Sequence, residues 1–355
     1  MNKLIFSVNA KKYSLIFIYA YLLITCIFWG MAAFLEPING DLTRTGNVSE
    51  NSFGWEKQQP RIPEELLHNY PITGADVVVI GDSFSWSLVW QTKLVADGFK
   101  VSTAFSHDVP LCADLGNLLR VSGFSGKYLI IESIERFFQQ NMNSNCKNNS
   151  HYKAVSTGLT SPPPVNRLRS SGFDSGFSFG VGWSIKVFVN EIQLKINAIR
   201  PKEGLMAFGG VQVSAMDGCR FFSNKLCNYG LFYNQDFSKE TFVSTDKVLE
   251  LNQSLQRVGI QAIWLIIPDK STVYLGYGRY NKYPYNNIWH ELDRYPELTA
   301  PDLGEEFIQK AINIKDFYAP NNTHLSTEGY LYLGSLVSDK IKFLESINHV
   351  NGRMD

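Results

Sequence analysis

The chain lacks an excess of charge of either sign, because 33 basic residues balance 33 acidic ones over 355 residues. Without a net positive charge there is no global electrostatic attraction to phosphates, and nucleic acid is not expected as a partner. The chain also lacks Cys-x-x-Cys pairs and histidine-rich spacing. We therefore predict no metal site and no cofactor.

Cysteine is scarce, with only five residues in the chain. Cys26 lies inside an apolar stretch, which leaves Cys112, Cys146, Cys219 and Cys227. Four thiols fit two disulfides in an oxidising compartment, and three pairings are possible. The short loop between Cys219 and Cys227 favours that pair and leaves Cys112 for Cys146. Four free buried thiols are the alternative.

The longest uncharged run, residues 13–35, is apolar and long enough to cross the hydrocarbon core of a bilayer. Lysines precede this run and acidic residues follow it, so the positive-inside rule puts the N-terminus in the cytoplasm. Residues 1–35 are then a cytoplasmic tip and a transmembrane anchor in a bacterial inner membrane, with the remaining chain in the periplasm. A cleaved signal peptide is the rival interpretation, but no clean Ala-x-Ala site follows.

Two further segments are expected after the anchor. Residues 36–70 are polar and without periodicity, which is typical of a linker. Residues 71–350 are predicted to form one domain, interrupted by an insertion at about 141–204 that shapes a substrate cleft. Apolar strand-like runs alternate with helical segments in this domain, which predicts an α/β fold with a parallel sheet and helices on both faces. The expected strands are 75–80, 100–105, 128–132 and 261–267, and the first helix is expected at 85–97.

Gly81-Asp82-Ser83 follows the apolar run 77–80 directly. A serine at this corner would lie at the carboxyl end of a parallel strand, where open α/β sheets bind ligands. Ser83 is therefore the candidate nucleophile. The alternative is a helix N-cap, but Ser85 can fill that role and leave Ser83 available.

A candidate base occurs about 240 residues later, in Asn321-Asn322-Thr323-His324-Leu325-Ser326. A serine needs a base to become a nucleophile, and the base needs an orienting partner. None of the other five histidines lies in a comparable polar motif. A loop histidine satisfied by neighbouring carbonyls is the alternative.

These motifs together resemble the SGNH (GDSL) hydrolase superfamily. Within it, residues 81–85, 267–274 and 322–330 look like the branch of alginate O-acetyltransferases and related polysaccharide acetylation proteins. The resemblance implies a three-layer α/β/α fold, with Ser83 as nucleophile and His324 as base.

The chain departs from that family at the third catalytic position. The superfamily has Asp three residues before the histidine and the acetyltransferase branch has it two before, where this chain has Asn321 and Asn322. We consider three solutions in this order: a Ser-His dyad oriented by Asn321, an acid supplied by Asp316 or Asp269, and a weakened enzyme. Asn322 is the orienting residue if the motif places this position two residues before the histidine instead of three.

Other residues are weaker candidates for substrate or oxyanion contacts. Arg136 could contact substrate, although an ion pair with Glu132 one helical turn away is the simpler interpretation. Gly209 could let a ligand approach the backbone, although a tight hairpin is the simpler interpretation. Asp269 is a candidate support for the histidine loop, or part of a plain turn.

We expect an anchored periplasmic O-acyltransferase that acetylates an exported or cell-surface polysaccharide through an acyl-serine. The resemblance implies a multi-pass membrane acyltransferase as the partner that supplies the acetyl group. One alternative is a carbohydrate or lipid esterase using the same Ser-His pair. The other is a non-catalytic polysaccharide-binding or assembly component.

Overall fold

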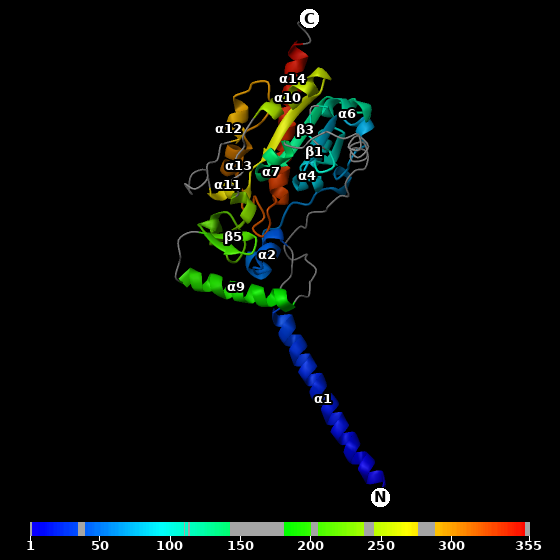
Figure 1. Cartoon of the computed structure of the whole chain (residues 1–355), viewed down its shortest axis with the longest axis vertical. Helices are drawn as coiled ribbons and strands as arrows, with labels where there is room; N and C mark the ends of the chain where they lie inside the picture. Colours follow the sequence, from blue (N-terminus) through cyan, green and yellow to red (C-terminus); the bar gives the residue numbers. More distant parts are fainter. Residues whose placement is uncertain are drawn as a thin grey trace.

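The computed structural model describes residues 2–34, 40–109, 111–112, 114–142, 181–199, 205–237, 245–275 and 288–351. A long helix at the N-terminus, α1 (Asn2–Phe34), projects from an α/β body, and the two chain ends lie at opposite ends of the molecule (Figure 1). Within α1, residues Ala10–Ile27 have a mean hydropathy of 1.4 and none of them is buried. By length and composition, this helix fits a single membrane span or a signal sequence.

A four-stranded parallel sheet forms the centre of the body. Its strands are β1 (Val77–Gly81), β2 (Val101–Phe105), β3 (Tyr128–Ile134) and β7 (Gln261–Ile267), in the order β2-β1-β3-β7. Almost every residue of these strands is buried, as the continuous apolar runs of a doubly covered parallel sheet predict. The prediction of an α/β fold with a central parallel sheet is confirmed.

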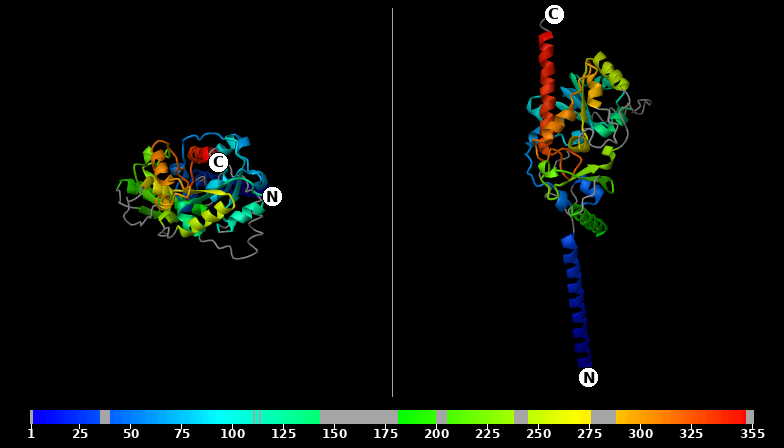
Figure 2. Two further views of the ribbon diagram at one scale, coloured as in Figure 1. Left: turned by 90° about the horizontal axis from the view of Figure 1, so that it is seen from above. Right: turned by 90° about the vertical axis from the view of Figure 1, so that its left-hand side faces the viewer.

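Helices cover both faces of this sheet (Figure 2). The chain moves one way from β1 to β2 and the other way from β2 to β3, and right-handed crossovers then place the connecting helices on opposite faces. Accordingly α5 (Gln91–Ala96) contacts α14 (Thr327–Asn351), while α6 (Leu115–Val121) contacts α10 (Asp246–Arg257).

The helix predicted at 85–97 is split in two. A short helix α4 (Ser83–Trp86) ends before α5 begins, and Leu88 between them has a φ of 58°. A left-handed residue cannot continue a right-handed helix. The chain therefore turns sharply after the candidate nucleophile, and the apolar periodicity of the sequence gave no sign of it.

A second, antiparallel sheet contains β4 (Leu205–Phe208), β5 (Val211–Ala215) and β6 (Tyr229–Tyr233). Gly209 lies in the two-residue turn between β4 and β5 with a φ of +57°, which favours glycine. A Cβ on Gly209 would lie 2.6 Å from the backbone oxygen of Thr45. The hairpin interpretation of Gly209 is confirmed, and the backbone that approaches it closely belongs to the chain itself.

Residues 41–53 differ from the polar linker that the sequence predicts. They form α2 (Asp41–Gly46) and α3 (Glu50–Phe53), and Leu42, Val48 and Phe53 are buried in a core shared with the second sheet. Three widely spaced apolar residues give no detectable helical or strand periodicity in the sequence. Their packing against the second sheet is nevertheless enough to hold this short segment in place.

The remaining elements connect these layers. The insertion predicted at about 141–204 lies largely outside the described residues. The structure therefore describes only parts of it. The other described elements are η1 (Glu64–Leu66), η2 (Ile72–Gly74), α7 (Glu135–Met142), α9 (Val181–Ile199), η4 (Gly218–Arg220), η5 (Asn234–Phe237), α11 (Lys270–Leu275), α12 (Ile288–Asp293) and α13 (Leu303–Ala311).

One predicted disulfide is present, between Cys219 and Cys227. Cys146 lies outside the described residues, and with it the expected bridge to Cys112. Cys26 is a free thiol on the surface of α1.

Replacing Cys219 and Cys227 together by serine should lower the free energy of unfolding by about 2.5 kcal/mol, the loop-closure entropy of a short bridge. Guanidinium unfolding of the full chain in detergent, followed by tryptophan fluorescence, measures this loss. Cys26→Ser is the control and should leave stability unchanged. A loss no larger than that of the control would contradict a structural role for the bridge.

Candidate active site

Ser83 is exposed at the carboxyl end of β1, where it begins α4. Asp82 holds the turn in place, because its Oδ1 accepts from the Phe84 N–H at 2.9 Å and its Oδ2 accepts from the Ile134 N–H at 2.8 Å. The N-cap of this helix is thus Asp82. The capping alternative for Ser83 is not needed, and its hydroxyl is left for other contacts.

A buried carboxyl lies beneath this turn. Glu132 Oε2 accepts from the Ser85 hydroxyl at 2.6 Å and from the Asp82 N–H at 3.0 Å. Burial and, after it, the charge of Asp82 raise the pKa of Glu132 well above its ordinary value. A Cβ on Gly81 would collide with both Ser85 and Glu132, which explains the glycine before the candidate nucleophile.

His324 contacts Ser83 directly. Its Nε2 lies 2.9 Å from Ser83 Oγ, and its Nδ1 lies 2.8 Å from Asn322 Oδ1. An amide oxygen is only an acceptor, so Nδ1 carries the proton and donates it to Asn322. Nε2 is then the acceptor for the serine hydroxyl, the arrangement that a general base requires.

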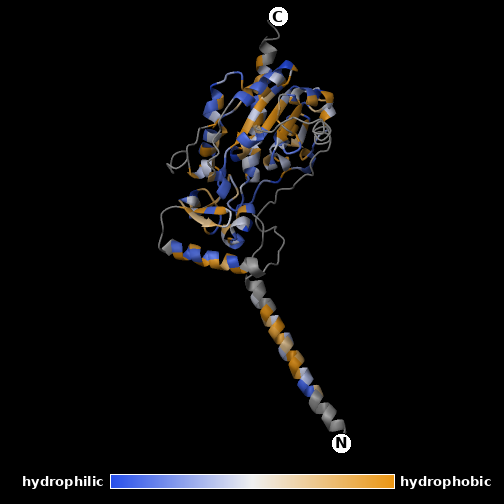
Figure 3. Ribbon diagram, viewed as in Figure 1, coloured by the Kyte–Doolittle hydropathy of each residue, from blue (hydrophilic) through white to orange (hydrophobic). Residues whose placement is uncertain are grey.

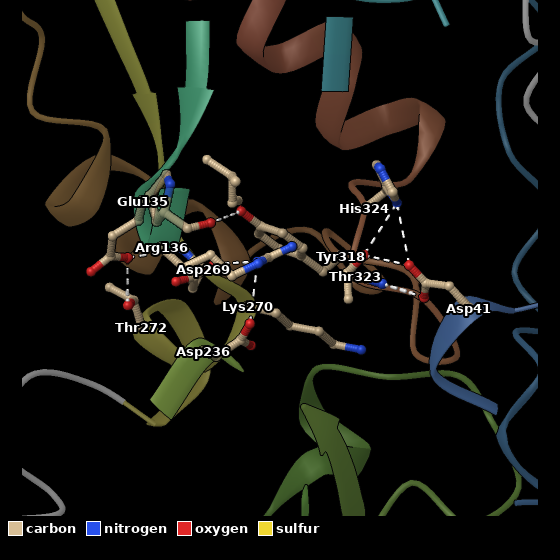
Figure 4. Close-up of polar contacts among 12 residues, drawn as sticks. Asp41, Glu135, Arg136, Asp236, Asp269, Lys270, Thr272, Tyr318, Thr323 and His324 are labelled. Carbon is tan, nitrogen blue, oxygen red and sulfur yellow. Dashed lines mark hydrogen bonds and ion pairs between the residues drawn. The ribbon is translucent and has the colours of Figure 1, made fainter. Parts of the chain in front are cut away.

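A carboxylate that the sequence did not suggest lies beside the imidazole. Asp41, the first residue of α2, has its Oδ2 at 3.6 Å from His324 Nδ1, and its Oδ1 accepts from the Thr323 N–H at 2.8 Å (Figure 4). Burial acts to raise the pKa of Asp41, but hydrogen bonds and charge from His324, together with the bonds from Thr323, outweigh it and lower this pKa. Asp41 is therefore an anion at neutral pH.

The three alternatives for the missing acid lie elsewhere. Asn321 is turned away from the imidazole and donates from Nδ2 to Glu50. Asp316 accepts from the N–H of Ser223 at 2.7 Å and from its hydroxyl. Asp269 forms an ion pair with Arg136. The structure therefore brings Ser83, His324 and Asn322 together, with Asp41 nearby, and it does not bring Asn321, Asp316 or Asp269 to His324.

Arg136 belongs to a buried cluster of charges, drawn on the left of Figure 4. It pairs with both Asp269 and Asp236, and Glu135 accepts from the Asp269 N–H at 2.9 Å. Burial, followed by repulsion from Asp269, raises the pKa of both Glu135 and Asp236 to about 8. Arg136 is paired within this cluster instead of with Glu132, the ion pair that the sequence favours.

Lys270 connects this cluster to the histidine loop. Its Nζ donates to the backbone oxygens of Ala319 at 2.7 Å, Pro320 at 2.8 Å and Asn322 at 3.2 Å. Burial lowers the pKa of Lys270 to about 7, while Asp41 and Asp236 oppose that shift. The side chain thus caps three carbonyls of the loop that carries His324, which favours the loop-support interpretation of this segment over a plain turn.

Comparison with protein-family models, curated protein sequences and solved structures finds no significant match. No group of three or more His, Cys, Asp or Glu side chains suited to a metal ion occurs in the described part of the chain. The chemistry of this site is therefore argued from its geometry.

Asn322→Ala should lower the reactivity of Ser83 toward a fluorophosphonate by about 10- to 100-fold, because His324 loses the acceptor that fixes its tautomer. Asn322→Asp should preserve or raise the rate, since a carboxylate accepts the same proton. The rate of covalent labelling, measured where all variants are folded, provides the test. Asn321→Ala is the matched control and should lower the rate much less. Equal losses in the two alanine variants would contradict the assigned register.

Asp41→Asn should change the pH dependence of stability. The pKa of Asp41 is lower in the folded than in the unfolded chain, so its contribution is present above about pH 4 and is lost as pH falls through the folded pKa. The difference in melting temperature between wild type and variant should be largest near pH 7 and shrink below pH 4. The same change at exposed Asp108 should give no such trend. A difference that stays constant down to pH 3 would exclude the Asp41 contacts as its source.

Proposed function

We propose that this protein is an acyl-transfer enzyme of SGNH type that uses Ser83 as nucleophile and His324 as general base. The observation that carries the proposal is the continuous set of contacts from exposed Ser83 Oγ through His324 to Asn322 Oδ1. A serine, a base and an orienting acceptor in this geometry are the minimum for nucleophilic catalysis.

In the first half of the reaction, Ser83 Oγ would attack the carbonyl carbon of an acyl ester while His324 Nε2 takes the hydroxyl proton. The tetrahedral intermediate then loses the donor alcohol, which receives that proton from Nε2, and an acyl-serine remains. In the second half, an acceptor hydroxyl gives its proton to Nε2 and attacks the acyl-serine, and Ser83 regains a proton. The Ser83 N–H, at the first turn of α4, supports the oxyanion in both halves.

Asn322 and Asp41 would each perform one role of the usual triad acid, which both orients the histidine and stabilises its charge. Asn322 fixes the proton on Nδ1 but has no charge to stabilise an imidazolium. Asp41 supplies an anion 3.6 Å from the same nitrogen, and attraction between opposite charges at that distance favours the protonated intermediate. This arrangement would supply both the orientation and the charge of the missing aspartate without Asp316 or Asp269.

The acceptor we propose is a hydroxyl of an exported polysaccharide, with the acetyl group supplied by a multi-pass membrane acyltransferase. The support is the resemblance to polysaccharide acetylation proteins together with the position of the site. His324 precedes α14, whose start lies at the α1 end of the body beside α2 (Figure 1). If α1 spans the inner membrane, the site would lie in the periplasm, in the half of the body nearer the membrane.

Two other functions use the same evidence differently. An esterase would form the same acyl-serine and release it to water, so the geometry of Ser83 does not separate transfer from hydrolysis. A non-catalytic binding component is favoured only by the absence of an aspartate at positions 321 and 322, and the anion of Asp41 weakens that case.

Full-length protein in detergent should release acetate from an acetyl-ester reporter, and oligosaccharide should accelerate turnover and become acetylated. Ser83→Ala should abolish turnover and His324→Ala should lower it by about a thousandfold or more. Reporter consumption and mass spectrometry of the sugar provide the readouts. Acetate release unchanged by sugar would favour the esterase, and sugar binding without any Ser83-dependent turnover would favour the binding component.

A further inference from the structure

Helix α9 lies across the head of α1, between that helix and the α/β body (Figure 1). The two helices contact each other, and α9 runs in a clearly different direction from α1 (Figure 1). Apolar and polar residues alternate along it, while the middle of α1 is strongly apolar (Figure 3). The orientation of its two faces distinguishes α9 from an ordinary surface helix.

The face turned toward the body combines polar side chains with the buried Val187 and Leu194. Asn190 donates to the backbone oxygens of Gly46 at 3.3 Å and Asn47 at 2.9 Å, and Glu191 accepts from Ser52 at 3.0 Å. Leu194 on the same face enters the core beside α2 and α3. Specific hydrogen bonds therefore fix the rotation of α9 about its axis.

The face turned away from the body is apolar. Ile185, Val189, Ile192 and Ile196 recur at helical spacing and are between 43% and 59% exposed. A surface helix normally buries its apolar face and shows its polar face to water. In α9 a second apolar stripe is exposed, and the hydrogen bonds of Asn190 and Glu191 fix the helix in the rotation that exposes it.

The surroundings indicate what covers this face. The exposed apolar stripe adjoins the end of α1, the one candidate membrane span among the described residues. Lys186 and Lys195 are exposed beside the stripe, in the position where basic side chains meet lipid headgroups. If α1 crosses a bilayer, a helix beside its head, on the side of the body, lies at the level of the membrane surface.

We propose that α9 is an interfacial helix whose Ile185, Val189, Ile192 and Ile196 insert into the headgroup and acyl boundary of the lipid bilayer. The body is then held by two connections, α1 and α9, which fix its tilt instead of leaving it to swing on a single anchor. This inference concerns membrane contact only and does not depend on the chemistry proposed for Ser83.

The test places an environment-sensitive fluorophore at single cysteines in a full-length Cys26→Ser chain, which keeps the disulfides. Ile192→Cys and Ile196→Cys report on the stripe. Gln193→Cys is the matched control on the side of the same helix, and Val121→Cys, at a position 88% exposed, reports on the body. The chains are reconstituted in vesicles of phosphatidylethanolamine and phosphatidylglycerol containing acyl-brominated lipid.

Brominated lipid should quench the labels at Ile192 and Ile196 several-fold more than those at Gln193 and Val121, and aqueous iodide should show the reverse order. Circular dichroism melting confirms that each labelled chain is folded. Equal iodide quenching at all four positions would overturn the proposal. Protection at Ile192 in native membranes together with iodide access in lipid-only vesicles would also overturn it, because a protein partner would then be the occupant.

Discussion

The contact between residues 40–50 and the histidine loop holds the site together. The Leu42 N–H donates to the Asn321 carbonyl at 3.1 Å, and Thr323 and Asn321 bond to Asp41 and Glu50. Gly40 lies so close to Asn321 that a Cβ there would collide with its backbone. Loops are costly to order, because each fixed residue loses conformational entropy. The contacts with residues 40–50, together with those of Lys270, order the histidine loop. The ordered loop holds His324 at hydrogen-bonding distance from Ser83.

The same contact explains why the sequence predicted the candidate pair Ser83 and His324 but not the complete site. Ser83 and His324 lie in local motifs whose meaning depends on a strand end and a polar loop, and both features can be read from neighbouring residues. Asp41 lies near the start of the chain, far in sequence from Thr323 and His324. It belongs to a helix of six residues in which apolar residues show little periodicity. Only packing of α2 on the loop brings it to the imidazole. No local pattern in the sequence marks Asp41 as a partner of His324.

The choice between Asn321 and Asn322 shows a second limit of sequence reasoning. Adjacent side chains in an irregular loop point in different directions. Because a loop has no regular repeat, the sequence does not indicate which of the two faces the histidine. The sheet is different: continuous burial in a parallel sheet requires apolar residues at each position, so β1, β2, β3 and β7 were predicted within a few residues. The split after α4 was missed because a left-handed Leu88 has no compositional signal, unlike the glycines that usually adopt that conformation.

The buried charges have a related structural logic. Arg136 follows β3, Asp269 follows β7 and Asp236 follows β6, so one ion-paired cluster joins the two sheets at the edge that carries the site. Burying charges gives little net stability, because the loss of hydration offsets their attraction. Their geometry is nevertheless specific, since removing one partner leaves the others buried without compensation. The cluster thus fixes the position of Lys270, and Lys270 fixes the positions of the loop carbonyls that it contacts. The loop in turn fixes the position of His324. A serine motif on one strand becomes a candidate nucleophile only because this set of contacts fixes the base on the opposite side of it.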